Sequence, residues 1–227
     1  MSTPIERLRA LDTCAVSDAL DRHGISGVLP GLRPLAADRA FAGRAVTVRL
    51  GPPAQDAGTA TPGDGLPKRH LGTAAVDASG RDDVVVVAHQ GRTDCAGWGG
   101  LLSRAAAERG IEGVVVHGAA RDLAEAAAAG LPVHAVTPTP VTARGRAVEH
   151  AWNEPVEIGE VTVAPGDLVL ADSGGVVVVP ADRIDEVLAT AERIAATEAA
   201  MAKAIEAGTP VSVVMGKTYE ELTDADD

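Results

Sequence analysis

The sequence predicts one α/β domain with a parallel-rich central sheet, flanking helices and a long C-terminal helix. Between residues 84 and 136, short runs of valine alternate with alanine-rich segments of helical length. This order is typical of parallel sheets with right-handed crossovers. The 227 residues are 46% hydrophobic but only 2% aromatic, so the core is expected to consist of Val, Leu, Ile and Ala. That length suits one large domain or two small ones, and no boundary divides residues 1–227.

The first expected helix lies near the N-terminus. Thr13 is placed to cap a turn that runs to Leu20, and Gly24 follows that turn. A stretch rich in proline and glycine at residues 27–34 leads into residues 45–50, whose alternating side chains predict a strand.

The central part is expected to alternate strands with helices. Buried strands are predicted by the apolar runs at residues 84–88, 113–116 and 131–136. Helices are predicted at residues 101–109 and 119–129, because each segment is followed by a glycine in the C-cap position, Gly110 and Gly130.

The C-terminal part changes character. Four short strands separated by turns that contain glycine predict hairpins or a small β layer, at residues 156–158, 161–163, 168–171 and 176–179. A long alanine-rich helix at residues 181–207 is expected to close the domain. The polar tail at residues 223–227 is expected to be frayed.

Residues 51–69 are rich in proline and glycine and have hardly any large apolar side chain. They predict a flexible loop that is longer than compact domains usually carry. The loop is interpreted either as a disordered insertion or as a lid near an active site.

Charge and composition exclude several classes of function. With 20 basic and 32 acidic residues the net charge is −12, which disfavours sequence-independent binding of nucleic acid phosphates. No apolar run has the length of a membrane span, and no signal peptide pattern is visible at the N-terminus. The two cysteines, Cys14 and Cys95, are too few for a disulfide scaffold. We therefore expect a cytoplasmic protein without nucleic-acid or membrane partners.

The densest group of candidate site residues is Gly97-Trp98-Gly99-Gly100 together with Arg121-Asp122. The glycines lie between a strand and a helix start, where free N–H groups favour an anion. Arg121 and Asp122 follow the next strand, and the carboxyl ends of parallel strands meet at one sheet edge. Arg121 suits a carboxylate, and Asp122 suits Mg²⁺ or Mn²⁺. This pattern predicts a site for a 2-oxo acid, although an exposed Arg-Asp pair that caps a helix would have the same sequence.

The spacing of these residues resembles a known family. Gly100 is followed after twenty residues by Arg121-Asp122 and after two more by Glu125. This resembles the signature of the class II pyruvate aldolases, which include 4-hydroxy-4-methyl-2-oxoglutarate/4-carboxy-4-hydroxy-2-oxoadipate aldolase and belong to the RraA-like superfamily. Further matching segments lie at residues 16–20, 43–48 and 165–180.

The resemblance implies a swivelling β/β/α fold, a homotrimer or homohexamer, and active sites between subunits. It implies that Asp122 binds the divalent metal and that Arg121 holds the substrate. It also implies that Glu198 of an adjacent subunit lies near the metal site, although a solvated helix charge is the alternative. The backbone amides that would hold the pyruvyl carboxylate belong to the loop residues Gly97, Gly99, Gly100, Leu101 and Leu102.

Two positions depart from the family pattern. Characterised aldolases have an acidic residue where this chain has Gly100. Asp94 is a candidate replacement, or else a solvated loop charge. His117 stands where family members often carry Asp, and it is interpreted either as a proton relay or as a core histidine.

These observations predict a divalent-metal-dependent lyase that releases pyruvate from a 2-oxo acid, by retro-aldol cleavage, by oxaloacetate decarboxylation, or by both. The alternative is a non-catalytic regulator like the RraA proteins that inhibit ribonuclease E. Those regulators lack the acidic residue of the full motif, which is Glu125 in this chain. A related lyase or hydrolase is a third possibility, which Gly100 and His117 leave open.

Overall fold

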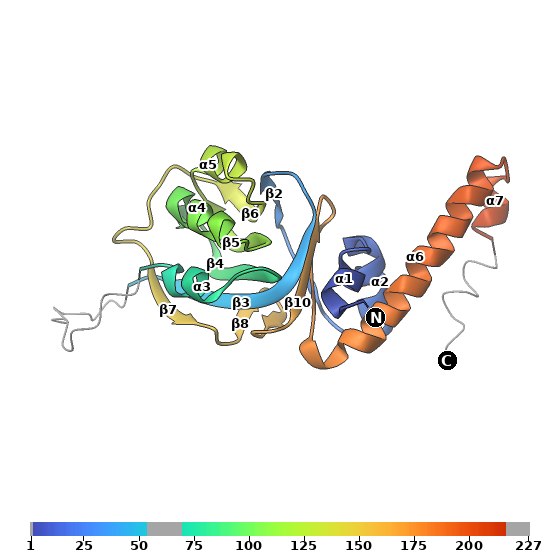
Figure 1. The fold of residues 1–227 in the computed structure, drawn as a ribbon, viewed down its shortest axis with the longest axis horizontal. Helices are drawn as coiled ribbons and strands as arrows, with labels where there is room; N and C mark the ends of the chain where they lie inside the picture. The colour runs from blue at the N-terminus through green and yellow to red at the C-terminus, as the bar shows by residue number, and fades with distance from the viewer. Residues whose placement is uncertain (1, 54–69, 217–227) are drawn as a thin grey trace.

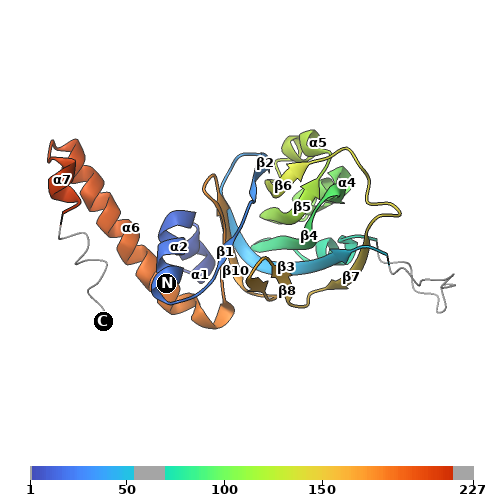
Figure 2. The ribbon, with the colours of Figure 1, turned by 180° about the vertical axis from the view of Figure 1, so that it is seen from behind.

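The computed structural model describes residues 2–53 and 70–216 and has the predicted α/β architecture. A sheet with the strand order β1-β11-β10-β3-β4-β5-β6-β2 forms its centre, and β7 pairs with β3 beside this path. Helices α4 and α5 lie at one end of the molecule, whereas α1, α2 and the long α6 lie at the other (Figures 1 and 2).

The central parallel strands confirm the predicted alternation. Strand β3 (Phe41–Gly51) pairs in parallel with β4 (Asp83–Trp98), β4 with β5 (Gly113–Ala120), and β5 with β6 (Val133–Pro138). Helix α4 (Gly100–Glu108) connects β4 to β5. Gly110 follows the C-cap residue Arg109 and adopts a left-handed conformation with φ 74°, as expected of a glycine that ends a helix.

The helix predicted at residues 119–129 is shorter than expected. Ala119 and Ala120 complete β5, where they pair with Ala96 and Trp98 of β4. Helix α5 (Leu123–Ala128) begins only after Asp122. Pairing between strands therefore overrides the helix propensity of the two alanines, and this difference leaves the Arg121-Asp122 turn at the strand end.

The N-terminal region contains α1 (Pro4–Leu8) and α2 (Thr13–Arg22). The predicted cap was wrong by one residue, because Asp12 is the N-cap of α2 and accepts a hydrogen bond from the Ala15 amide at 2.8 Å. The Thr13 hydroxyl instead donates to Asp172 at 2.6 Å. The following stretch rich in proline and glycine forms two strands that the sequence did not predict, β1 (Val28–Leu29) and β2 (Arg33–Ala36).

The C-terminal half confirms the predicted hairpins. Strands β8 (Val156–Ile158) and β9 (Val161–Val163) form a separate antiparallel pair. Strands β10 (Leu168–Asp172) and β11 (Gly175–Val179) form a hairpin within the main sheet. Two further elements were not predicted from the sequence, α3 (Thr73–Ala78) and β7 (Val148–Trp152).

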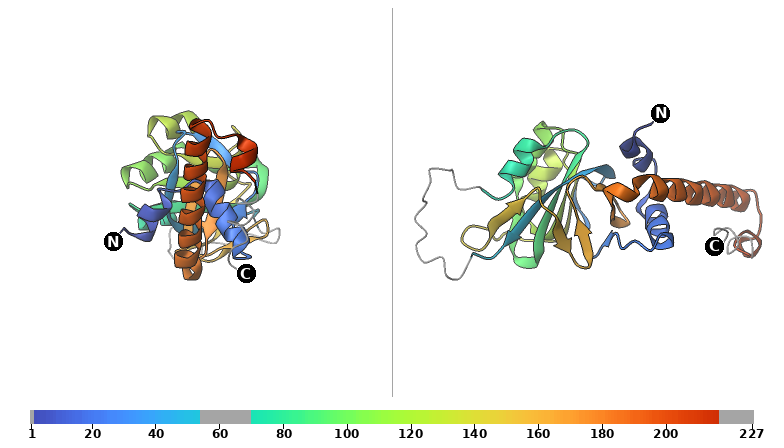
Figure 3. Two further views of the ribbon diagram at one scale, coloured as in Figure 1. Left: turned by 90° about the vertical axis from the view of Figure 1, so that its right-hand side faces the viewer. Right: turned by 90° about the horizontal axis from the view of Figure 1, so that it is seen from below.

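The predicted C-terminal helix consists of a 3₁₀ turn (Ala181–Arg183) and α6 (Ile184–Glu206), followed by α7 (Val211–Val214). The first half of α6 packs against α1 and α2 through four buried apolar residues, Val187, Leu188, Ala191 and Ile194. The second half projects away from the sheet (Figure 3). Its exposed apolar side chains include Ile205, and α7 adds Val211 and Val213.

Two of the predicted features involve residues that the structure does not describe. Gly51 ends β3, but residues 54–69 of the predicted loop and the tail at residues 223–227 are not among the described residues. Among the described helices, none is long and apolar enough to cross a membrane.

Buried histidines make the stability of the fold depend on pH. His89 and His134 are 0% and 1% exposed, and burial lowers the pKa of each imidazole. In both rings Nε2 contacts a backbone carbonyl, while Nδ1 has no partner among the described residues. Each histidine is therefore favoured in its neutral form in the folded state.

We expect the free energy of unfolding to fall as the pH is lowered from about 7 to 5. The unfolded chain takes up protons on histidine near pH 6.5, before the folded chain does, and so binds more protons in this window. Urea unfolding at several pH values measures the slope. His134→Gln should flatten it, whereas the exposed His150→Gln should not. An unchanged slope in His134→Gln would contradict this explanation.

Candidate active site

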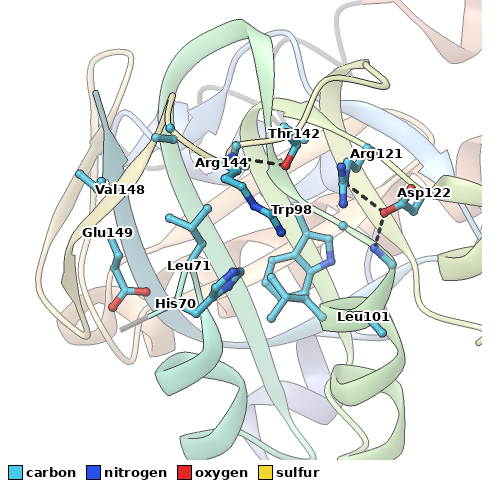
Figure 4. A pocket seen from close by; sticks show the side chains of 18 residues that line it. His70, Leu71, Trp98, Leu101, Arg121, Asp122, Thr142, Arg144, Val148 and Glu149 are labelled. Atoms are coloured by element: carbon cyan, nitrogen blue, oxygen red, sulfur yellow. Dashed lines mark hydrogen bonds and ion pairs between the residues drawn. The ribbon is translucent and has the colours of Figure 1, made fainter. Parts of the chain in front are cut away.

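A cavity of about 860 Å³ lies at the carboxyl ends of β4 and β5 (Figure 4). All predicted residues of the glycine loop and the Arg-Asp pair line it: Gly97, Gly99, Gly100, Leu101, Leu102, Arg121 and Asp122. The topology therefore brings the two predicted segments together at one sheet edge, where parallel α/β proteins bind ligands.

Asp122 occupies an unusual backbone conformation at the start of α5. Its φ of 56° and ψ of 37° are left-handed, which Asp tolerates better than most residues. The carboxylate makes no capping bond to its own helix. Instead Oδ2 accepts a hydrogen bond from the Gly100 amide of α4 at 3.1 Å and lies 3.2 Å from Nε of Arg121. The carboxylate therefore does not cap its own helix but caps α4, because it accepts the amide of the first residue of that helix.

Glycines allow the β4–α4 turn to approach this pair. A Cβ atom on Gly99 would lie 3.2 Å from Oδ2 of Asp122 and 3.3 Å from Nε of Arg121. Beyond the turn, the amides of Leu101 and Leu102 have no hydrogen-bond partner within residues 2–53 and 70–216. In the described part of the chain these two amides are open to an anion. The Gly100 amide, which was also expected to hold the anion, is instead bound to Asp122.

The carboxylate of Asp122 is chemically suited to bind a hard divalent cation. Oδ1 has no hydrogen-bond or ion-pair partner in the described part of the chain, and the side chain is 38% exposed. No group of three or more His, Cys, Asp or Glu side chains suitable for a metal occurs among the described residues. A metal here would therefore rely on one carboxylate together with water and substrate oxygens, which suits Mg²⁺ rather than a closed zinc site.

A side chain at position 100 would contact Glu125 and Asp122. A Cβ atom at this position would lie 2.7 Å from Oε2 of Glu125 and 3.0 Å from Cβ of Asp122. Glu125 is held there by an ion pair with Nε of Arg104 at 3.0 Å, outside the cavity. An acidic side chain at position 100 would require Glu125 to move, so the glycine and the motif glutamate are sterically coupled.

Asp94 and His117 do not line the cavity. Asp94 forms a two-pronged ion pair with Arg92, with distances of 2.9 and 2.6 Å, and this pairing lowers the pKa of its carboxyl group. His117 is half-buried in β5, and burial lowers its pKa. Its Nδ1 has no partner among the described residues.

Glu198 is exposed on α6, a helix that runs away from the end of the molecule that carries α4 and α5 (Figure 1). Within one chain the structure therefore does not bring Glu198 to Asp122.

One wall of the cavity was not predicted from the sequence. This wall comes from the loop between β6 and β7, from the start of β7 and from the segment before α3, and its polar members are His70, Thr142, Arg144 and Glu149. One signal was available, the turn sequence Ala143-Arg144-Gly145-Arg146, but only the tertiary fold places this loop opposite the Arg121-Asp122 turn.

Comparison with known proteins identifies the family. A model described as RraA-like, Aldolase/RraA, matches residues 13–178. The chain belongs to the Aldolase/RraA family. This confirms the predicted resemblance, and the match covers both the glycine loop and the Arg121-Asp122 turn.

Relatives extend the similarity over most of the chain. A Halalkalibacterium halodurans protein named "Putative 4-hydroxy-4-methyl-2-oxoglutarate aldolase" is 30% identical over 201 residues, covering 88% of each chain. Protein DlpA of Legionella pneumophila is 32% identical over 214 residues. That match covers 92% of this chain, which spans about a third of DlpA (32%).

Solved structures of similar fold include an uncharacterised protein from Pseudomonas syringae pv. tomato, with a TM-score of 0.81 and 29% identity, covering 94% of this chain and 96% of that one. RraAS2 of Streptomyces coelicolor has a TM-score of 0.75 and 26% identity, with coverages of 86% and 93%. It is described as an unusual member of the RNase ES inhibitor RraA protein family. The family thus contains proteins named as aldolases and as ribonuclease inhibitors.

Proposed function

We propose that this member of the Aldolase/RraA family is a divalent-metal-dependent lyase that cleaves a carbon–carbon bond of a 2-oxo acid and releases pyruvate. One observation supports the proposal most strongly. One cavity is lined by the guanidinium of Arg121, by Oδ1 of Asp122 and by the amides of Leu101 and Leu102. This oxygen and these amides have no partner within residues 2–53 and 70–216. A regulator that acts only by binding another protein would not require this arrangement of groups in a cavity.

The residues of the cavity have separate roles in binding the substrate and in holding the metal. Arg121 offers a planar pair of donors for the carboxylate of the 2-oxo acid, and the amides at the start of α4 add further donors. Asp122 would hold Mg²⁺ or Mn²⁺ through Oδ1, while the Gly100 amide and Arg121 fix the carboxylate through Oδ2. When bound, the metal supplies Lewis-acid polarisation of the 2-oxo group. The left-handed backbone of Asp122 keeps its side chain aimed at α4 rather than at its own helix.

The experiment that tests the proposal is pyruvate release by the purified protein in the presence of Mg²⁺ or Mn²⁺. Oxaloacetate and 4-hydroxy-2-oxo acids are the substrates, and inhibition of ribonuclease E is measured in parallel. We expect pyruvate release without ribonuclease inhibition. Inhibition of the ribonuclease with no turnover of any 2-oxo acid would favour the regulator instead.

We further propose that the protein assembles as a trimer or hexamer in which Glu198 completes the site of an adjacent subunit. The exposure of Glu198 on the projecting helix α6 supports this proposal, because such a helix can reach a neighbouring subunit. Glu198→Ala is then expected to lose activity while retaining metal affinity.

Mixed oligomers test the shared site. Subunits with Asp122→Asn and subunits with Glu198→Ala are each inactive alone, but mixing them under conditions of subunit exchange should regenerate some intact sites. Glu206→Ala, which alters another exposed glutamate of α6, serves as the control and should retain activity. If Glu198→Ala has wild-type turnover, the shared-site proposal is wrong.

A further inference from the structure

We infer that Arg144 is a specificity-determining residue that binds a second carboxylate, carried by the part of the substrate beyond its 2-oxo acid group. This inference rests on the proposed function and deepens it. The group that would bind the second carboxylate is the guanidinium of Arg144, in the loop between β6 and β7. Its side chain points into the cavity toward Trp98 (Figure 4).

The charges in the cavity leave Arg144 without a partner. The described part of the lining contains two arginines, Arg121 and Arg144, and two carboxylates, Asp122 and Glu149. Asp122 pairs with Arg121. Oε2 of Glu149 accepts a hydrogen bond from the Gly72 amide at 2.7 Å, whereas its Oε1 is buried without a partner among the described residues. Within residues 2–53 and 70–216, the Arg144 guanidinium forms no ion pair or hydrogen bond.

Among the described residues, the lining carries two positive and two negative side chains, in a chain whose net charge is −12. An acidic protein repels anionic ligands over most of its surface, so an exposed arginine on the wall of the cavity, such as Arg144, affects where an anion binds. Arg121 lies beside the amides that would hold the first carboxylate. A second carboxylate on the same molecule would then find its counter-ion at Arg144.

Hydrogen bonds from β4 hold the loop that carries Arg144 in position. Nη1 of Arg92 donates to the Arg146 carbonyl at 2.7 Å, and Asp94 holds the same guanidinium through its two oxygens. The Ala96 amide of β4 also donates to the Val141 carbonyl at 3.0 Å. These contacts fix the turn that presents Arg144. Asp94, which the sequence offered as a possible substitute for a missing acidic residue, is therefore assigned as a positioning residue.

The binding test uses two acids that differ only at the far end. In the presence of Mg²⁺, 2-oxoglutarate and 2-oxopentanoate both carry the 2-oxo acid group, but the first ends in a carboxylate and the second in a methyl group. Calorimetry gives the ratio of their dissociation constants. We expect the wild-type protein to prefer 2-oxoglutarate at least tenfold, Arg144→Ala to lose the preference, and Arg144→Lys to keep part of it.

Arg81→Ala removes an exposed arginine outside the cavity and should retain the full preference. The inference is overturned if wild-type protein shows no preference, if neither acid binds, or if Arg144→Ala keeps the preference. Because binding needs no turnover, this result is independent of the pyruvate-release assay. A preference that depends on Arg144 in a protein without lyase activity would refute the proposed function but not the second carboxylate site.

A double-variant comparison tests whether Asp94 positions the loop that carries Arg144. Asp94→Ala should reduce the preference for 2-oxoglutarate about threefold when Arg144 is present, because the turn loses its fixed position. In the Arg144→Ala background the same change should alter the ratio no further. If Asp94→Ala lowers the affinity for both acids equally in both backgrounds, Asp94 does not act through Arg144.

Discussion

Replacing Asp122 by Asn is expected to lower the rate of pyruvate release by about 1,000-fold or more, since loss of a Lewis-acid contribution of ~4 kcal/mol corresponds to three powers of ten. The change removes the negative charge that a divalent cation requires. Asn has nearly the same shape and tolerates the left-handed backbone of position 122. Its side-chain oxygen can still accept the Gly100 amide, so we expect the thermal unfolding temperature to change little.

The measurement combines steady-state kinetics with Mn²⁺ binding. Asp122→Asn should bind Mn²⁺ much more weakly than the wild type. The control is Asp77→Asn, which alters an exposed aspartate of α3 outside the cavity and should retain both properties. Turnover that survives in Asp122→Asn at unchanged metal concentration would show that the metal is held elsewhere.

Arg121→Lys is expected to reduce kcat/KM for oxaloacetate at least tenfold. Lysine keeps the positive charge but loses the planar fork that binds a carboxylate through two parallel hydrogen bonds, a difference of roughly 1.4 kcal/mol or more. It also loses the contact between Nε of Arg121 and Oδ2 of Asp122 at 3.2 Å. Arg121→Ala should therefore have a larger effect than Arg121→Lys.

The matched control for this series is Arg22→Lys, an exposed arginine at the end of α2, which should leave kcat/KM unchanged. Comparing KM with kcat distinguishes the role of Arg121. A rise in KM is expected from lost carboxylate binding, and a fall in kcat from poorer orientation of the reacting bond. Wild-type kinetics for Arg121→Ala would place the substrate carboxylate elsewhere.

The parts of the fold that depend on local sequence could be predicted. The valine runs of β4 and β5 and the glycines after α4 and α5 specify their elements through short-range preferences. The elements that were missed depend on distant partners. Strand β1 pairs with β11, and β7 pairs with β3, across long stretches of sequence. No local pattern marks such pairings, because cross-strand neighbours decide strand formation.

The candidate site likewise contains residues that could be predicted from the sequence and residues that could not. The spacing of Gly100, Arg121 and Asp122 located one wall of the cavity, since parallel strands deliver their ends to one edge. Arg144 and Glu149 line the other wall, and they come from a loop and an unpredicted strand. The role of Asp94 could not be inferred from its position in the sequence either, because it depends on Arg92 and on the Arg146 carbonyl 54 residues beyond Arg92.

Metal-dependent lyase activity is tested most directly by pyruvate release from the wild-type protein before and after chelation. Purified protein is assayed with oxaloacetate and with a 4-hydroxy-2-oxo acid, then treated with EDTA, and finally supplied with excess Mg²⁺ or Mn²⁺. We expect pyruvate release to be lost after EDTA treatment and restored by either metal, with no restoration in Asp122→Asn. Pyruvate release that continues at full rate after complete removal of metal would show that catalysis does not depend on a divalent metal at Asp122.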